Sequence, residues 1–341
     1  MQGPPAIQDI VNLAVEIVTS RTFLEIVVFP GLLSVFVAAA LLIWLERKVI
    51  ARVQLRIGPL YAGMWGILQL VADGVKLLFK QMIFPELADA KLLMLCALGL
   101  MMIAAAPLVA IPFGDGLVIA NMDVGLIYVF AAISLFPSLI LLIGWGSNSK
   151  YSFIGGLRSL FQQVAYEIPM WLSVLGIVML TGTLNLTEIV RAQQRLWFIV
   201  PQILGFVVFF AAILAELERI PFDLPEAETE LVMGWMTELT GAAFMVGFLA
   251  MTTKLYVMSA LITALFLGGW SGPPILPQPV WFLLKTFLVA TVMFIIRGTF
   301  PRVRVDILLR TGWTRLLMVA FANVFVTAML IWLGFGWVWR V

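Results

Sequence analysis

Long runs of apolar residues, separated by shorter polar connections, repeat along the whole chain. A run of about 20 such residues can cross the hydrocarbon core of a bilayer as a helix, because a helix rises ~1.5 Å per residue and the core is about 30 Å thick. The pattern predicts eight membrane-spanning helices. Their ranges are 24–45, 92–112, 126–145, 164–182, 197–215, 240–265, 280–297 and 316–337.

None of these runs alternates apolar and polar residues with the period of two that marks a membrane-spanning β-barrel. Continuous apolar segments satisfy their backbone polar groups within helices instead. The composition agrees, since 62% of the residues are hydrophobic, 12% are charged and the mean hydropathy is +1.07. The sequence therefore predicts an all-α, polytopic membrane protein that forms a single integral membrane domain over residues 1–341.

Lysine and arginine residues gather in every second connection. The loops after the first, third, fifth and seventh predicted spans, with Arg297 counted among them, hold 15 of the 21 basic residues, and the opposite side holds 4. Because basic loops stay in the cytoplasm, both termini are expected on the extracytoplasmic side. The expected location is a prokaryotic cell membrane, with a thylakoid-type membrane as the alternative.

The first 23 residues lack the basic front and the small-residue cleavage site of a signal peptide. The spacing of their apolar positions predicts a short amphipathic helix that lies on the membrane surface. These positions are Ile7, Ile10, Val11, Val15 and Val18.

The chain has one cysteine, Cys96, and no histidine. It therefore lacks the residues for a Cys/His site that would hold zinc or haem. No glycine-rich nucleotide loop follows a strand pattern. Any redox cofactor is expected to belong to a partner, and the chain alone is expected to perform no catalysis.

The connection 46–91 is too long and too patterned for a simple turn. Its second half places apolar residues on one stripe and predicts an interfacial or re-entrant helix. Its first half combines charges with the glycines and proline of RIGPLYAG, which favour turns and close backbone approach. Such a loop is suited to guide a polar headgroup attached to a lipid tail. The candidate residues for this chamber are Glu46, Arg47, Arg52, Arg56 and Asp73.

A second loop, 216–239, holds seven of the 19 acidic residues. Carboxylates crowded at the start of a helix repel one another, which raises the proton affinity of some of them. A solvated acidic face is the better interpretation in a soluble protein, but in so apolar a chain these groups are candidates for a proton path. Glu218 is one of the seven, and the proton-path candidates are Glu216, Asp223, Glu226, Glu228, Glu230 and Glu238.

Ionisable residues also fall in or beside predicted spans. Glu167 precedes Pro169 at the expected start of the fourth span, where it is either a helix-dipole partner or a membrane-buried carboxylate. Lys254 in the sixth span either snorkels to the surface or pairs with an acid from a neighbouring helix. Glu167 and Lys254 join the proton-path candidates, and Lys285 is a lesser one.

Eight motifs, in order along the chain, carry a resemblance to a known family. They are ERK, QLRIGP, ILQLVADGVKL, GSNSKYSFIGGLR, YEIP, ERIPFDLPEAETELVMG, LFLGGW and PRVRVDILLRTGW. Together they resemble the membrane subunit of respiratory complex I that joins the peripheral arm to the membrane arm, called H in bacteria and 1 in mitochondria. The resemblance extends from about residue 30 to 335.

This resemblance implies a narrow chamber through which a quinone headgroup reaches the terminal iron–sulfur cluster of neighbouring subunits, and buried carboxylates that begin a proton path. The chamber candidates Glu46, Arg47, Arg56 and Asp73 match family positions, as do Glu167 and the acidic loop. The implied ligand is a quinone-type lipid acceptor, bound as a substrate. The implied partners are other membrane-arm subunits, peripheral iron–sulfur subunits and lipid, and no nucleic acid is expected.

The chain also departs from the family pattern. Leu60 and Tyr61 stand where the family usually has Asn-Arg, and the intramembrane glutamate of the sixth span falls on Met251. Glu218 is an added acid at a position where asparagine is common. The GSNSKYSFIGGLR motif and the lost glutamate look closer to the ferredoxin-linked photosynthetic and archaeal branches, so the electron donor and the acceptor, a quinone or a phenazine, stay open.

Two other functions compete with this interpretation. The homologous membrane subunit of a membrane-bound nickel–iron hydrogenase, or of a deazaflavin-linked (factor 420) dehydrogenase, would use the same carboxylates with other electron carriers. A secondary transporter with a midplane substrate site would show an internal repeat between its halves, and the sequence has none.

Overall fold

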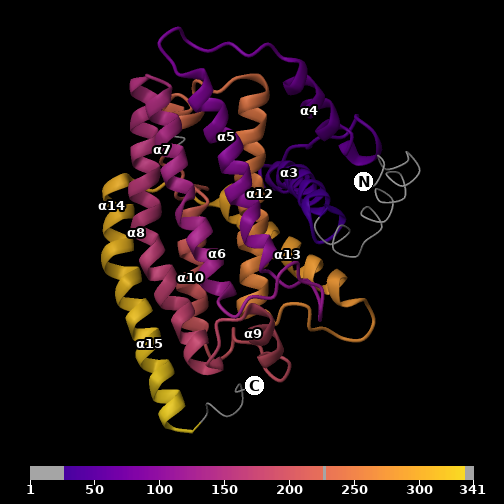
Figure 1. Ribbon diagram of the computed structural model, residues 1–341, viewed down its shortest axis with the longest axis vertical. Helices are drawn as coiled ribbons and strands as arrows, with labels where there is room; N and C mark the ends of the chain where they lie inside the picture. Colours follow the sequence, from indigo (N-terminus) through magenta and orange to yellow (C-terminus); the bar gives the residue numbers. More distant parts are fainter. Residues whose placement is uncertain (1–26, 226–227, 335–341) are drawn as a thin grey trace, which may run out of the picture.

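The computed structural model describes residues 27–225 and 228–334, so the predicted amphipathic segment 1–23 lies outside the described residues. Within them the secondary structure is helical, apart from one isolated bridge between Gly114 and Leu117. The long helices form an elongated bundle, with α4 standing off at one end and α9 lying at the other (Figure 1). The predicted all-α class is confirmed.

Six helical segments of the described chain are long and apolar enough to cross a membrane. Several combine neighbouring helices, such as α6 and α7, which meet at Leu135. The segments are α5 with η3 (Ala90–Val109), α6 (Gly125–Ser134) with α7 (Phe136–Gly146), α8 (Lys150–Thr181), α12 (Gly241–Phe266), α13 (Gln278–Thr299), and α14 (Val305–Arg310) with η5 (Thr311–Leu316) and α15 (Leu317–Trp332).

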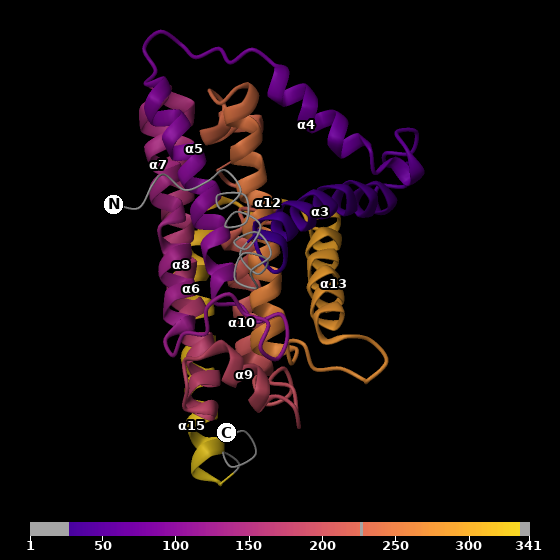
Figure 2. The ribbon, with the colours of Figure 1, turned by 45° about the vertical axis from the view of Figure 1, so that its right-hand side comes forward.

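The other two predicted spans take a different form. The first corresponds to α3 (Leu32–Val53), which carries four charged side chains in its second half and runs across the bundle in Figure 2. The fifth corresponds to α10 (Ile203–Glu216), whose 14 residues give a length of about 21 Å, shorter than the hydrocarbon core. The structure thus supports six of the eight predicted crossings, and the remaining two stay predictions.

The fourth predicted span begins much earlier than the sequence suggested. Helix α8 extends over 32 residues from Lys150, and Pro169 lies inside it rather than in its first turn. A proline is tolerated inside a membrane helix where neighbouring helices re-satisfy the freed backbone groups. The helix ends at Gly182, whose φ of 75° is the left-handed conformation that glycine adopts most easily at a helix end. Glu167 is therefore a mid-helix residue.

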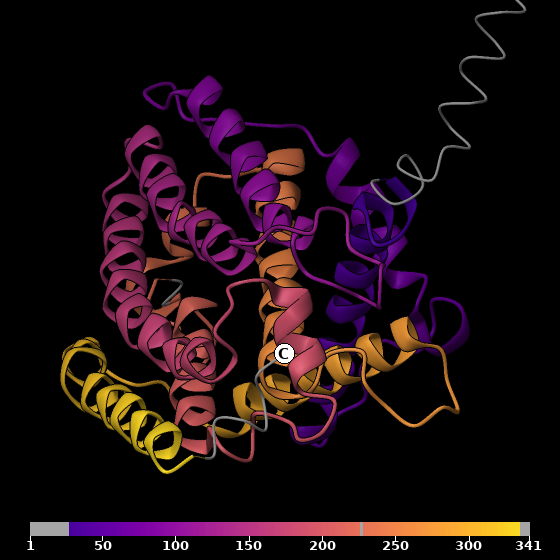
Figure 3. The same ribbon diagram turned by 60° about the horizontal axis from the view of Figure 1, so that its bottom comes forward.

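Helix α12 is the centre of the molecule. Every residue from Ala250 to Phe266 is buried, and α5, α13, α3 and α10 pack around it. In Figure 3 it lies inside the ring formed by the other helices. A helix that is hydrophobic on all sides is buried on all sides. Lys254 on this helix is consequently enclosed by protein rather than by lipid.

The long loops carry short helices near the cytoplasmic end expected from the sequence. The helix predicted in the second half of the loop 46–91, interfacial or re-entrant, is present as α4 (Gln69–Phe79), preceded by η2 (Met64–Gly66). No residue of α4 is buried, and its position relative to the membrane stays a prediction. The acidic loop contains α11 (Glu228–Leu231) and η4 (Gly234–Met236). On the opposite end, α9 (Leu186–Ala192) connects α8 with the chain leading to α10. Both long loops thus face the same end of the bundle as the basic connections.

Candidate functional site

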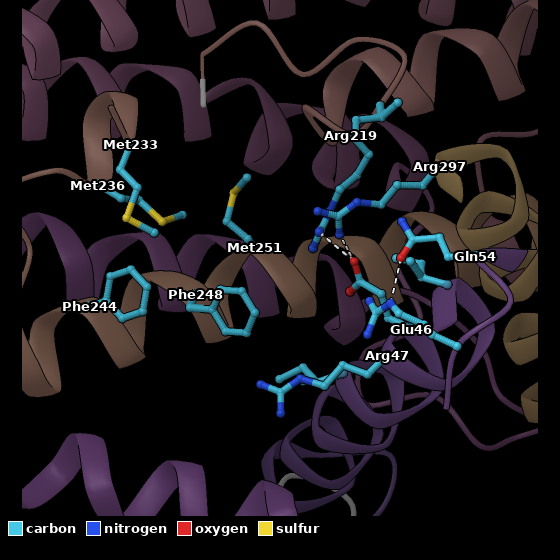
Figure 4. Close-up of a pocket in the computed structure, with 14 residues that line it drawn as sticks. Glu46, Arg47, Gln54, Arg219, Met233, Met236, Phe244, Phe248, Met251 and Arg297 are labelled. Atoms are coloured by element: carbon cyan, nitrogen blue, oxygen red, sulfur yellow. Dashed lines mark hydrogen bonds and ion pairs between the residues drawn. The ribbon is translucent and has the colours of Figure 1, made fainter. Parts of the chain in front are cut away.

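A cavity of about 440 Å³ lies between α3, η4, α12 and α13. Its wall has two chemical halves, which Figure 4 shows on opposite sides. The polar half is formed by Glu46, Arg47, Gln54, Arg56, Arg219 and Arg297. The apolar half is formed by Met233, Met236, Phe244, Phe248 and Met251.

Glu46 is the acidic centre of the polar half. It lies on the buried stripe of α3 and is 6% exposed. Its Oε1 accepts from the Arg219 guanidinium at 3.0 Å and also ion-pairs with Arg297. Two guanidiniums therefore share one buried carboxylate, and the cluster keeps a net positive charge beside the cavity.

Arg47, the next residue of α3, turns toward the loop instead. Its Nη1 donates to Oδ2 of Asp73 at 2.6 Å, which ties α3 to α4. Gln69 donates to the other oxygen of Asp73 at 3.0 Å. Burial alone would raise the pKa of Asp73, but the hydrogen bonds from Arg47 and Gln69 outweigh it and hold the pKa below its usual value.

The two remaining chamber candidates are separated by the structure. Arg56 borders the cavity and donates to the Gln54 side chain at 2.8 Å. Arg52 is exposed on the last turn of α3 and is not part of the cavity wall. The expected close backbone approach is present, because a Cβ on Gly58 would lie 3.1 Å from the Arg47 carbonyl oxygen. Leu60 and Tyr61, where the chain departs from the family, are exposed and lie outside the wall.

A ligand that fits both halves of the cavity needs a polar end and an apolar body. Arg47 is compensated by Asp73, but Arg56, Arg219 and Arg297 stand against the single Glu46. They favour an electron-rich or anionic headgroup, because guanidinium groups donate strong hydrogen bonds to such acceptors. Methionine and phenylalanine adapt to flat or flexible apolar groups. Lipid-soluble carbonyl compounds combine these two properties.

Behind the cavity, Lys254 forms a buried ion pair with Glu216. The Lys254 ammonium is 2.9 Å from Oε1 of Glu216, and both residues are 2% exposed. It also donates to the Glu216 carbonyl and to Oε1 of Gln163, each at 2.9 Å, and lies 4.1 Å from the centre of the Phe136 ring. Two interpretations of Lys254 were open, snorkelling to the surface and pairing with an acid from a neighbouring helix. In the structure Lys254 forms the pair.

Gln163 extends this cluster to a second carboxylate. Its Nε2 donates to Oε1 of Glu218 at 2.7 Å and to the Ser159 hydroxyl at 2.8 Å, and Ser159 donates to the same Glu218 oxygen. Glu218 is 1% exposed, and burial raises the pKa of its carboxyl. We call Glu216, Lys254, Gln163, Glu218 and Ser159 the buried cluster.

The buried cluster and the cavity meet in one turn of the chain. Glu218 and Arg219 follow α10 directly, and Glu218 has a φ of +52°. The Glu218 side chain bonds α8, whereas the Arg219 side chain bonds Glu46 on the cavity wall. A single peptide unit therefore joins the buried cluster to the cavity wall.

Glu167 lies beside this arrangement, half-buried on α8, where it accepts from the Ser134 hydroxyl. Two carboxylates of the acidic loop each pair with an arginine. Asp223 pairs with Arg302 at 3.0 Å, and the exposed Glu230 pairs with Arg158 at 2.5 Å. The hydrogen bond from Arg158 lowers the pKa of Glu230, which is opposite to the direction expected from mutual repulsion.

The remaining predicted loop residues are Glu238, Glu226 and Glu228. Glu238 is half-buried in the segment before α12. Glu226 lies outside the described residues, and the side chain of Glu228 is not described. Among the described residues there is no group of three or more Cys, Asp or Glu placed to hold a metal ion.

Sequence reasoning missed several residues that complete the site. Arg219 and Arg297 were counted only as loop charges, although they share Glu46. Gln163 and Ser159 gave no signal beyond being polar residues in a segment that precedes an apolar run. The helical spacing of Ser159, Gln163 and Glu167 over one side of α8 would have been visible had that helix been predicted to begin at residue 150.

Comparison with known proteins gives a consistent picture. A family profile described as NADH dehydrogenase matches residues 25–328. Similar proteins, each named as the H component of NADH-quinone oxidoreductase, occur in Dehalococcoides mccartyi strain CBDB1 (44% identity, over 86% of this chain and 83% of that protein) and Rhodospirillum centenum (42%, over 87% and 90%). Another, from Brevibacillus brevis, is 46% identical over 85% of this chain and 87% of that protein.

Proposed function

The chain belongs to the NADH dehydrogenase family of respiratory membrane subunits, and from this premise we propose that it forms the acceptor chamber and the first proton-coupling element of a complex I-type oxidoreductase. The resemblance stated from its motifs is thereby confirmed at the level of the family. As a member it acts as a subunit of a proton-translocating oxidoreductase complex, together with other subunits of that complex. The closer relation to ferredoxin-linked branches stays a prediction.

The observation that carries the proposal is the two-sided cavity with a buried ion cluster directly behind it. The arginines around Glu46 are suited to hold the carbonyl oxygens of a quinone-type lipid acceptor, and the methionine and phenylalanine wall to hold its ring and tail. Electrons would come from an iron–sulfur cluster of a peripheral partner, because a chain with one cysteine and no histidine lacks the ligands for such a cluster of its own. This chain would bind and orient the acceptor.

Reduction of the acceptor would be coupled to proton movement through electrostatics. Negative charge that builds up on the acceptor lies next to Arg219 and close to the buried cluster, and it raises the proton affinity of nearby carboxylates. Glu216 and Lys254, with Glu167 beside them, are the groups we propose for the inner part of this path. Because Glu230 is exposed, we propose it only for the entrance of the proton path.

The acceptor site can be tested with two variants on opposite walls of the cavity. Arg56→Gln and Phe248→Ala are each expected to raise the KM for the acceptor roughly tenfold, the equivalent of one charge-assisted hydrogen bond or one apolar contact. Activity of the assembled complex with a short-tail quinone gives the measurement. Arg191→Gln, on α9 at the other end of the bundle, is the matched control. An unchanged KM in both cavity variants would contradict the proposal.

The coupling role has its own test. In the assembled complex, Glu216→Gln and Asp223→Asn are compared for acceptor reduction and for proton pumping, measured separately. Loss of pumping with retained reduction is expected, because both carboxylates lie away from the cavity wall. If both activities stayed at the level of the unmodified complex, these carboxylates would have no part in coupling.

The names of the relatives favour a quinone over the acceptors of the two competing assignments. All three relatives are components of NADH-quinone oxidoreductase, and none is a hydrogenase or a transporter. Identification of the peripheral subunits that co-purify with this chain, by mass spectrometry, separates these cases. A nickel–iron large subunit among them would replace the quinone reductase with the hydrogenase.

A further inference from the structure

The buried cluster contains more acid than base. It holds the carboxyl groups of Glu216 and Glu218 and one ammonium group, on Lys254. With all three groups ionised it would carry a net negative charge in a place shielded from water. Isolated charges are strongly disfavoured in such surroundings, so the neutral arrangement is two opposite charges and one proton.

We propose that Glu218 is the carboxyl that carries the exchangeable proton of this cluster, while Lys254 favours the ionised form of Glu216. This inference rests on the proposed coupling function and names the group on which it acts. The step is a proton transfer only: a water-borne proton binds the Glu218 carboxylate to give the carboxylic acid, and the same proton later returns to water. No other bond forms or breaks.

The contacts of the two acids differ in the way this assignment requires. The Lys254 ammonium bonds both the side chain and the backbone carbonyl of Glu216. Glu218 receives neutral donors: the Ser159 hydroxyl and the Gln163 amide both reach its Oε1, and the neutral Trp235 indole also interacts with its carboxyl. A cation at direct contact favours the ionised carboxylate far more than neutral donors do.

The second oxygen of Glu218 adds to this argument. Oε2 is buried without a hydrogen-bond partner among the described residues, as is Oε2 of Glu216, but only Glu216 has the Lys254 ammonium in direct contact to compensate its charge. A carboxylate oxygen left in this condition keeps its charge without compensation, whereas a proton on it removes that charge. The geometry thus leaves one oxygen for fixed hydrogen bonds and the other for the proton.

Gln163 connects the two acids and fixes their roles. Its carbonyl oxygen accepts from Lys254, which directs its amide N–H groups toward Glu218 and Ser159. The adjacent Gln162 donates to the backbone carbonyls of Ala215 and Phe222, so the turn that carries Glu218 is held on α8. These glutamines are positioning residues.

The connection to the cavity sets the direction of the response. The charged groups that face Glu218 are Glu216 on α10 and Lys254 on α12, while Glu167 on α8 faces Glu216. Arg219, the next residue, pairs with Glu46 on the cavity wall. Negative charge entering the cavity attracts the arginines and raises the proton affinity of Glu218, which then takes up a proton. Departure of that charge releases it.

The direct test is infrared difference spectroscopy of the whole complex, with and without acceptor turnover, in protein labelled with carbon-13 glutamate. The carbonyl band of a protonated buried carboxylic acid is expected in the unmodified complex and is expected to be lost in Glu218→Gln. Glu86→Gln, an exposed carboxyl in the loop before α5, is the matched control and should leave the band in place. Persistence of the band in Glu218→Gln would overturn the assignment.

A second variant guards against misfolding. Asparagine adopts the left-handed conformation more easily than other non-glycine residues, and Glu218 has a φ of +52°. Glu218→Asn therefore removes the acid while relieving the backbone. It should assemble as well as the unmodified chain, lose the same band and lower the number of protons pumped per acceptor reduced.

The two proposals fail in different ways. If Arg56→Gln raises the KM for the acceptor but Glu218→Gln and Glu218→Asn keep both the band and the pumping ratio, the acceptor site stands and the role of Glu218 is wrong. If the band disappears with Glu218 while the cavity variants leave the KM unchanged, the carboxyl carries the proton and the acceptor binds elsewhere.

The role of Lys254 is tested by a matched pair of variants. Lys254→Met alone is expected to leave Glu216 without its cation, so a second protonated-carboxyl band should appear. Adding Glu216→Gln should abolish that second band and restore assembly. If Lys254→Met gave no second band in complex that assembles, Lys254 would not be the group that keeps Glu216 ionised.

Discussion

At the scale of single residues, the site is governed by which charges share a partner. Glu46 serves two guanidiniums, whereas the cluster behind the cavity has one ammonium for two carboxyls. The first region thus has more bases than acids and the second more acids than bases, and the two lie on either side of one peptide unit, between Glu218 and Arg219. Buried pairs of this kind are sensitive to the loss of one member, because the other is left uncompensated.

This sensitivity predicts that substitutions at two adjacent residues of α3 lower the stability of the folded state by different amounts. Glu46→Gln is expected to destabilise the folded state by about 3–5 kcal/mol, since it leaves two partly buried guanidiniums without their carboxylate. Arg47→Gln is expected to cost less than about 1 kcal/mol, because its ion pair with Asp73 is partly exposed. Thermal unfolding of the purified complex measures both. Equal losses would contradict the burial argument.

At the scale of elements, α4 lies against α12 and α3 without burying any residue. None of its residues is buried, and its links to α3 are the Arg47–Asp73 pair and, through η2, the hydrogen bond from the Trp44 indole to the Trp65 carbonyl at 3.0 Å. An element that buries no residue opens locally at low free-energy cost. The pair at Asp73 is thus the main side-chain tie between α4 and the cavity wall.

The docking of α4 should depend on this pair and on pH. The pKa of Asp73 is below its usual 3.8, so the tie is fully present above that value and is lost as the pH falls through the lowered pKa. Asp73→Asn should loosen α4 at neutral pH. A double-mutant cycle with Arg47→Gln, read by spin-label distances from α4 to α12, is expected to give a coupling of roughly 0.2–1 kcal/mol. A coupling energy of zero between Arg47 and Asp73 would mean that other contacts, such as those of the backbone, hold α4 in place.

Sequence patterns predicted the long apolar helices well and the interrupted ones poorly. The ranges of α12 and α13 differ from the predicted spans by only a few residues, because their apolar runs are continuous. The start of α8 was missed, since polar residues such as Ser159 and Gln163 face protein instead of water. The partner of Lys254 was not predictable either: hydropathy places a lysine in a helix, and only the packing of α10 against α8 brings Glu216 to it.

At the scale of the whole molecule, the bundle has two unlike ends. The end with α4 and the acidic loop carries the cavity, and the end with α9 carries the Arg191–Asp115 ion pair and the Lys285 ammonium, which bonds three backbone carbonyls after α12. The distribution of basic residues predicts that the first end faces the cytoplasm. That is also the side from which a peripheral electron-transfer arm would have to approach the cavity.

The orientation can be measured by cysteine labelling. Cys96 is buried, so new cysteines at exposed positions report without interference. Arg195→Cys, near α9, is expected to react with a membrane-impermeant maleimide in intact cells, and Tyr61→Cys, before α4, only in inside-out vesicles. The reverse pattern would invert the topology.

The enclosure of Lys254 has a consequence for how the chain is made. Its ammonium has its carboxylate partner on α10, a helix that is synthesised earlier, and α12 is wrapped by protein along its inner length. A lone lysine in hydrocarbon is costly. The sixth crossing therefore has to leave the insertion machinery in company with α10 and α8, so that biogenesis of this region proceeds as a group of helices and not one at a time.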